Sequence, residues 1–270
     1  MPGSGSERLH ALDAVRAFAL LAGIAFHATL SFLPSAPGVS LWIVMDTHRS
    51  VALSILFYVL HNFRLMTFFF IAGFFGRMSF HRMGVRAFLG DRLKRIAVPL
   101  IVGWIVLFPA IVAVSIWGAL VMYPGKPLPP PPTASFPAFP LTHLWFLYVL
   151  LWFYAAVLIV RGLVAVIDRR GRLRAGLDAL VRGAVRVHLA PLLLAAPACA
   201  ALYLLPNWMM WFGIPTPDSS LVPNLPAVAG FGTAFAFGWL AQRDPGLLEI
   251  WRRCCWPRRP APPSICCRIG

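Results

Sequence analysis

Long apolar stretches alternate with short polar ones along the chain, and this pattern predicts a bundle of membrane-spanning helices. The apolar stretches cover residues 12–33, 51–76, 96–120, 143–160, 189–205 and 225–241. A helix of about 20 apolar residues is long enough to cross the hydrocarbon core of a bilayer. We therefore predict an all-α fold, a polytopic membrane helix bundle with about six transmembrane helices.

The polar stretches differ in charge, and the difference predicts how the helices are oriented. Residues 77–95 and 161–188 are strongly basic, whereas residues 34–50 and 122–142 carry a single Arg or Lys each. Loops rich in Lys and Arg stay on the cytoplasmic side of a membrane. We therefore expect two basic loops in the cytoplasm together with both chain termini. Residues 173–188 are expected to form an amphipathic helix at the membrane surface.

Composition supports a membrane protein and narrows its partners. Of the 270 residues, 59% are hydrophobic and only 12% are charged, against about 25% charged in soluble domains. The net charge of +15 is high enough to bind nucleic acid, but the cations lie in short stretches between apolar segments. We therefore expect membrane lipid as a partner and no nucleic acid.

The membrane domain is predicted to occupy residues 1–251, and the tail at 252–270 differs abruptly from it. The tail is rich in Arg, Pro and Cys, and its two Cys–Cys pairs lack a usual zinc-ligand spacing, so no metal site is predicted. Two interpretations of the tail stay open: a basic tail without fixed structure, or sequence read out of frame at a truncated end.

Polar side chains inside the first apolar stretch are the first candidates for function. Arg16 and His27 are eleven residues apart, which places them within about 20° of the same helix face and about 16 Å apart along the axis. Asp13 lies one turn before Arg16. A buried Arg costs about 2.5–3.5 kcal/mol on insertion scales, so it is kept where it faces protein, water or a ligand. The alternative is an Arg that extends to the interface and a His that hydrogen-bonds to a neighbouring helix.

The second apolar stretch adds a second pair of candidates. His61 and Arg64 are three residues apart and therefore share one face of a helix. The alternative for this pair is a structural interaction with Asp46. The stretch ends in an aromatic run in which Ala72 and Gly73 form a small-residue contact surface.

Two further pairs lie at the ends of later helices. Arg92 and Arg95 precede the third apolar stretch, and their alternative is to be orienting charges alone. His143 and Trp145 open the fourth stretch, where an aromatic residue also serves as an anchor at the membrane–water interface.

Four motifs, in this order, resemble the membrane acyltransferases of acyltransferase family 3. They are LDAVRAFALLAGIAFH at 12–27, FRLMTFFFIAGFF at 63–75, DRLKRIAVPL at 91–100 and HLWFLYVL at 143–150. Within that family, the chain is similar to the branch that modifies osmoregulated periplasmic glucans. It departs from the family pattern at Met66, where a proline is usual. It also has fewer predicted helices than the family, and so resembles the N-terminal part of a longer domain.

The resemblance implies an enzyme of the bacterial inner membrane. Such an enzyme moves an acyl group, succinyl in this branch, from acyl-CoA in the cytoplasm to hydroxyls of a periplasmic glucan. The donor substrate would be succinyl-CoA or acetyl-CoA, and no bound cofactor is implied. Two other classes of function stay open. One is a transporter or flippase with a polar path through its helices, and the other is a non-catalytic remnant.

The resemblance also implies roles for the candidate residues. Arg16, Arg92 and Arg95 would bind the phosphates of coenzyme A, for which Arg is well suited. His27, together with Arg16, would be catalytic, either by taking a proton from the sugar hydroxyl or by carrying the acyl group itself. The pocket would be completed by Asp13, His61, Arg64, His143 and Trp145.

Overall fold

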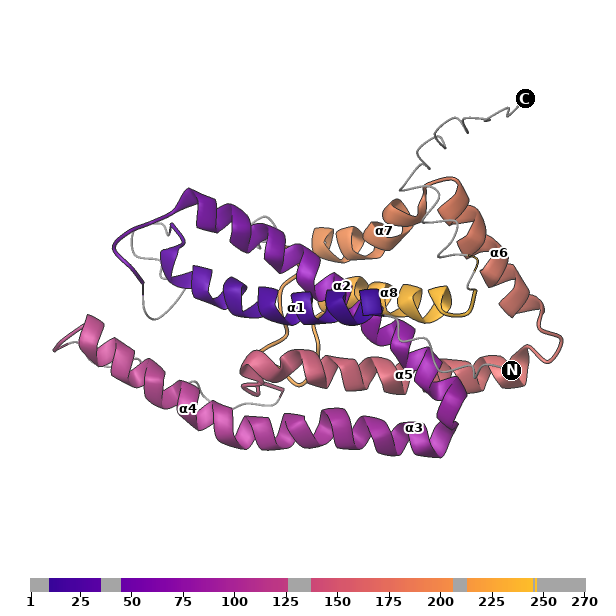
Figure 1. Ribbon diagram of the computed structural model, residues 1–270, viewed down its shortest axis with the longest axis horizontal. Helices are drawn as coiled ribbons and strands as arrows, with labels where there is room; N and C mark the ends of the chain where they lie inside the picture. Colours follow the sequence, from indigo (N-terminus) through magenta and orange to yellow (C-terminus); the bar gives the residue numbers. More distant parts are fainter. Residues whose placement is uncertain (1–9, 35–44, 126–136, 206–212, 245, 247–270) are drawn as a thin grey trace, which may run out of the picture.

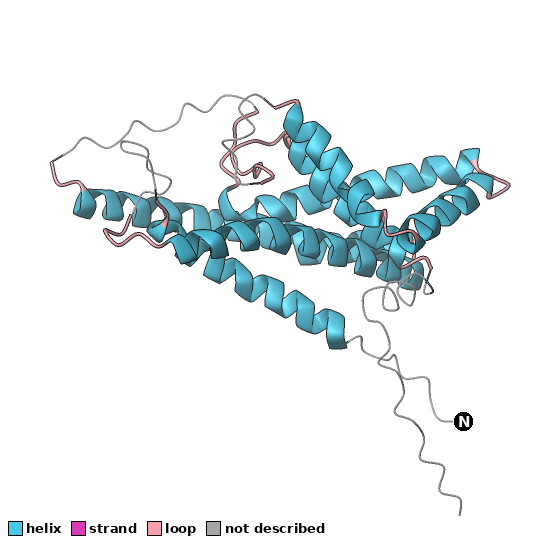
Figure 2. Ribbon diagram, turned by 90° about the horizontal axis from the view of Figure 1, so that it is seen from above, coloured by secondary structure: helices cyan, strands magenta, loops and turns pink. Residues whose placement is uncertain are grey.

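The computed structural model describes residues 10–34, 45–125, 137–205, 213–244 and 246, and the regular structure in these ranges is helical (Figures 1 and 2). The α-helices are α1 (His10–Thr29), α2 (Val51–Met83), α3 (Val85–Arg92), α4 (Val98–Met122), α5 (Trp145–Ile167), α6 (Arg172–Arg186), α7 (Ala190–Tyr203) and α8 (Leu225–Ala241). Short 3-10 turns at Leu30–Phe32 and Thr142–Leu144 adjoin α1 and α5, and a π-helical turn at Leu93–Ala97 joins α3 to α4.

The predicted membrane helix bundle is confirmed. Within the described residues, three helical segments are long and apolar enough to cross a membrane: α2, the joined helix Val85–Met122, and Thr142–Ile167. The pair α6 and α7, bent by 105°, would make a fourth span, and the apolar parts of α1 and α8 are shorter. The number six and the cytoplasmic termini stay predictions.

The basic stretch 77–95 is helical, not the loop that its charge pattern predicted. α2 continues to Met83, and α3 begins at Val85, with only Gly84 between them at a φ of 78°. Glycine adopts this left-handed conformation without steric cost. Arg is a good helix former, so the helix extends past the apolar segment until the glycine breaks it. α6 confirms the amphipathic helix expected near 173–188.

α2 is the central helix of the bundle and contacts α1, α3, α5 and α8 (Figure 1). It runs without a break through Met66, the position where the family has proline. Proline would remove one helical hydrogen bond and introduce a kink, so the methionine is consistent with the continuous helix. One helix can therefore carry side chains from one end of the bundle to the other.

α2 and α8 cross in antiparallel orientation at two glycines. A Cβ added to Gly73 would meet the backbone at Phe235, and one added to Gly238 would meet the backbone at Phe70. Small residues allow membrane helices to approach closely. The resulting van der Waals packing drives helix association in lipid, where the hydrophobic effect does not. The small-residue contact predicted at Gly73 is thus confirmed, and its partner is α8.

An aromatic core fills the space between α2, α5 and α8. Phe69 is completely buried, and its ring stacks on Phe231 with centroids 5.0 Å apart. Trp145 is also buried and lies 5.6 Å from Phe231. Aromatic pairs at this distance are stabilising beyond their buried area, so the core holds the start of α5 against α2.

Asp168 organises the turn from α5 to α6. Its carboxylate accepts hydrogen bonds from the backbone N–H groups of Leu173 and Arg174 and from Nε of Arg174. Desolvation acts to raise the pKa of Asp168, but these hydrogen bonds outweigh it and hold the pKa below its usual value. The carboxylate thereby satisfies free N–H groups at the start of α6.

Candidate active site

Three histidines and one arginine from three elements meet near one end of the bundle. His27 comes from α1, His61 and Arg64 come from α2, and His143 comes from the 3-10 turn before α5. The rings of His27 and His143 lie with their centroids 4.4 Å apart at an angle of 61°. We call these four residues the histidine cluster. The structure therefore brings together four of the residues predicted from the sequence.

Aromatic packing between α1 and α2 positions the cluster. The Phe26 ring stacks on His61 at 5.5 Å and on Phe57 at 4.6 Å. The guanidinium carbon of Arg64 lies 5.0 Å from the centroid of the same Phe26 ring, an arrangement that attracts a cation to the ring face. His61 and Arg64 thus face the same residue of α1, which confirms that they share one face of α2.

Gly23 makes room for Arg64 on α1. A Cβ at position 23 would lie 2.9 Å from Nη1 of Arg64, which is too close for an ordinary contact. The absence of a side chain lets the guanidinium lie against the α1 backbone next to Phe26. The surface of α1 at Gly23 and Phe26 therefore receives Arg64.

Among the described residues, three buried nitrogen atoms of the cluster have no hydrogen-bond partner. They are Nδ1 of His61, Nε of Arg64 and Nδ1 of His143. Buried polar groups in native proteins are nearly always hydrogen-bonded, and leaving one unpaired costs about 1–3 kcal/mol. Three such atoms on neighbouring side chains indicate a place where a polar ligand completes the hydrogen bonding.

The alternative in which His61 and Arg64 pair with Asp46 is wrong. The Asp46 carboxylate accepts hydrogen bonds from the backbone N–H of His48 at 2.7 Å and interacts with its ring nitrogen at 3.2 Å. The backbone hydrogen bond lowers the pKa of Asp46. Because this carboxylate is engaged in its own loop, it does not neutralise Arg64.

Two loops fix the position of His143. The backbone N–H of Thr142 donates to the carbonyl of Asp218 at 3.0 Å, and that of Leu221 donates to Pro137 at 2.9 Å. Thr142 has a φ of 50°, a left-handed conformation that is uncommon for a residue other than glycine and often marks a functional site. The strand-like pairing of the loops holds this conformation and directs His143 toward His27.

Asp218 is a neighbour of the cluster that the sequence did not single out. Desolvation raises the pKa of its carboxyl, while hydrogen bonds and the nearby His143 act in the opposite direction. Asp218 approaches His143 only because the loops 137–142 and 218–221 pair with each other. No local signal in the sequence predicts that pairing.

Asp13 and Arg16 lie on α1, toward the opposite end from His27. Their side chains are outside the part of the structure that is described. The separation of Arg16 from His27 along the helix is about 16 Å. Their shared face and their roles therefore stay predictions.

Arg92 and Arg95 lie at the other end of the bundle and differ in environment. Arg92 is 16% exposed, packs over the Phe88 ring at 4.8 Å and donates to the hydroxyl of Tyr154 at 3.4 Å. Arg95 is 77% exposed and pairs with Asp91 at 2.7 Å. Arg92 therefore connects α3 to α5, while Arg95 faces outward from the π-helical turn, a feature often found at functional sites.

Trp145 does not belong to the cluster. It is 7% exposed and packs between Phe69 and Phe231 in the aromatic core. His143 faces the cluster instead, because it lies in the 3-10 turn before α5, whereas Trp145 is the first residue of the helix.

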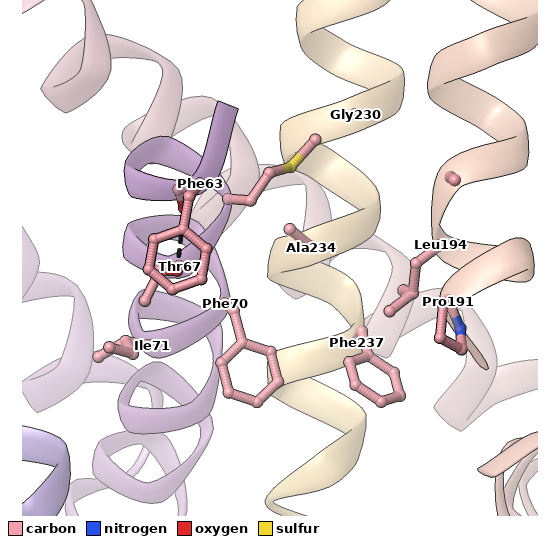
Figure 3. A pocket seen from close by; sticks show the side chains of 11 residues that line it. Phe63, Thr67, Phe70, Ile71, Pro191, Leu194, Gly230, Ala234 and Phe237 are labelled. Carbon is pink, nitrogen blue, oxygen red and sulfur yellow. Dashed lines mark hydrogen bonds between the residues drawn. The ribbon is translucent and has the colours of Figure 1, made fainter. Parts of the chain in front are cut away.

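A separate apolar groove of about 480 Å³ lies between α2, α7 and α8 (Figure 3). The residues lining its α2 side include Phe63, Thr67 and Phe70, and Leu194 and Phe237 lie across from them. On a regular helix, Phe63 and Phe70 point roughly opposite to His61. The groove is therefore on the other side of α2 from the histidine cluster and has little polar surface for chemistry.

Comparison with known proteins shows the family. A family model described as an acyltransferase domain matches residues 9–256. The chain belongs to acyltransferase family 3. No solved structure matches the chain.

Curated relatives within this family carry a common name. The chain is 30% identical over 148 residues to glucans biosynthesis protein C of Shigella dysenteriae serotype 1. It is 29% identical over the same length to the protein of that name from Escherichia coli strain K12. In both comparisons the match covers 54% of this chain and 37% of the relative. The chain therefore matches well under half of the relatives' length.

Proposed function

We propose that this chain transfers an acyl group from cytoplasmic acyl-CoA to a hydroxyl of a periplasmic glucan, with succinyl as the expected group. The observation that carries the proposal is the histidine cluster with its three unpartnered buried nitrogens. The family supports acyl transfer. The relatives' name supports a glucan as the acceptor.

In the proposed reaction, a sugar hydroxyl oxygen attacks the thioester carbonyl, so that a C–O bond forms and the C–S bond breaks. The hydroxyl proton moves to His27 and then to the departing thiolate, which leaves as coenzyme A. A neutral imidazole suits this role, because its ordinary pKa lies near physiological pH.

The other members of the cluster have complementary roles in this proposal. Arg64 would stabilise the negative charge that develops on the carbonyl oxygen, as hydrogen-bond donors do in acyl transfer. His143 and His61 would hold the acceptor through their free nitrogens. Arg16, Arg92 and Arg95 would bind phosphates of coenzyme A at the opposite, basic end.

The test is transfer of labelled acyl groups in membranes that contain this chain. His27→Ala should lower labelling of the glucan by at least about 100-fold, the usual contribution of a general base. His48→Ala is the matched control, because His48 is exposed at the same end of the bundle and should keep the full rate. The amount of inserted protein is measured for each variant by blotting the membrane fraction.

Each outcome bears on a different class of function. Full labelling by His27→Ala would remove His27 from the chemistry. Glucan movement without a covalent label would indicate a transporter or flippase. The absence of any label with the unaltered chain would indicate a non-catalytic remnant. Acyl label retained on the protein after quenching, and lost in His27→Ala, would indicate an acyl-histidine intermediate.

A further inference from the structure

A second group of cations lies at the end of the bundle away from the histidine cluster. It comprises Arg77 and His81 of α2, Arg161 of α5 and Arg243 just after α8, and we call it the cation cluster. Figure 1 shows the C-terminal ends of α2, α5 and α8 at this same end, beside α6. None of these residues belongs to the motifs that resemble the family.

The charges in the cation cluster are not balanced by described carboxylates. Arg77 experiences the unfavourable charges of Arg161 and Arg243, and only Asp178 acts in its favour. Asp178, however, is already paired with Arg243 at 2.9 Å. The nearby Asp244 is likewise paired with Arg182 at 2.7 Å. Counting Arg182 together with the three arginines of the cluster, four positive charges face two carboxylates, which leaves an excess of two positive charges.

Arg77 and Arg161 have no ion pair with a carboxylate in the described part of the chain. Nε of Arg77 is buried and has no hydrogen-bond partner among the residues that the structure describes. The Arg161 guanidinium is exposed and lies 4.4 Å from the centroid of the Phe80 ring. Phe80 in turn contacts His81 and Trp239. The aromatic ring thus holds one guanidinium in place while leaving its N–H groups available.

An excess of guanidiniums over carboxylates favours one kind of ligand. Like charges repel, and burial increases the cost, so the arrangement is most stable with an anion between them. The planar guanidinium donates two parallel hydrogen bonds to a phosphate. An excess of two positive charges also matches the charge of a phosphate monoester near neutral pH.

We propose that Arg77, Arg161 and Arg243 form a binding site for a phosphate group, carried by a soluble nucleotide or by a phospholipid headgroup. The site is separate from Arg92 and Arg95. The rings of Phe80 and Phe88, with centroids 5.5 Å apart, lie between Arg161 and Arg92. Along α2, Arg77 lies about 20 Å from Arg64. The proposal concerns binding and holds whatever reaction the chain performs.

The experiment measures phosphate binding by the full chain, with two probes. Adenosine 3′,5′-bisphosphate is titrated into detergent-purified protein by calorimetry. In parallel, native mass spectrometry counts phosphatidylglycerol that stays bound after purification from nanodiscs of phosphatidylcholine and phosphatidylglycerol. The variant is Arg161→Gln, because removing this side chain leaves no described carboxylate without its partner. The control is Arg86→Gln, which removes an exposed charge from α3 at the same end.

Arg161→Gln should weaken binding of one probe by about tenfold or more, the usual value of a bidentate charged contact, and Arg86→Gln should leave both unchanged. Loss for the bisphosphate identifies a nucleotide source, and loss for phosphatidylglycerol identifies a lipid. Equal affinities for the two variants, or no binding of either probe by the unaltered chain, would overturn the site.

A folding defect is checked by the thermal midpoint of each variant. If Arg161→Gln melts at a lower temperature, Arg161→Lys decides, because it keeps the charge and the contact with Phe80. Lysine lacks the planar fork, so this variant should bind the same probe several-fold more weakly. Unchanged binding by Arg161→Lys together with an unfolded Arg161→Gln would reduce Arg161 to a structural role and reject the proposal.

Discussion

Replacing Gly238 by alanine tests whether the crossing of α2 and α8 holds the bundle together. A Cβ at this position would lie 2.8 Å from the carbonyl carbon of Phe70 and closer still to its oxygen. These atoms belong to the α2 backbone, so no side chain can rotate away. The two helices must move apart at the point where both contribute to the aromatic core.

The size of the effect follows from two opposing contributions. Overpacking a tight contact costs about 1–3 kcal/mol, and the rigid backbone on both sides places this contact near the upper value. Alanine is a better helix former than glycine by about 1 kcal/mol. Gly238→Ala should therefore lower the free energy of unfolding by about 2 kcal/mol.

Gly162→Ala is the matched control. Gly162 lies in α5, and a Cβ there would meet nothing within 4 Å. The same substitution should stabilise the protein by about 1 kcal/mol through helix propensity alone. The two variants should thus change the free energy of unfolding in opposite directions and differ from each other by about 3 kcal/mol.

The assay is reversible unfolding in mixed micelles with increasing dodecyl sulfate, followed by circular dichroism. Gly73→Ala should behave like Gly238→Ala, because a Cβ at Gly73 would meet the backbone at Phe235. The double variant should cost less than the sum, since the first substitution already separates the helices. Equal stability of Gly238→Ala and Gly162→Ala would refute the close crossing.

Two other substitutions probe single contacts. Tyr154→Phe should lower the free energy of unfolding by about 0.5–1.5 kcal/mol, because it removes the hydroxyl that donates to the Ala72 carbonyl and accepts from Arg92; Tyr203→Phe at an exposed position is the control. Asp168→Ala should lower the thermal midpoint at neutral pH. Because the pKa of Asp168 is depressed in the folded state, its contribution is present above the unfolded-state pKa and is lost as the pH falls through the folded-state pKa. The thermal midpoints of Asp168→Ala and the unaltered chain should therefore become equal at low pH. A difference in thermal midpoint that stays constant across the acid range would contradict this reasoning.

The sequence by itself determined the helical class of the fold and where its helices lie. Backbone groups in a bilayer must be satisfied within each helix, so a long apolar stretch is enough to predict one. Helical spacing also predicted that His61 and Arg64 face the same way, and both contact Phe26. The continuation of the helix through residues 77–83 was missed, because basic charge was interpreted as a loop.

Only the tertiary structure decided which side chains meet. Membrane helices are apolar toward lipid and toward one another, so hydropathy does not distinguish a core face from a lipid face. The buried position of Trp145 and the contact of His27 with His143 therefore depend on packing between distant helices. The cation cluster was not foreseen for the same reason, since Arg77 and Arg161 belong to α2 and α5, which come into contact only in the folded bundle.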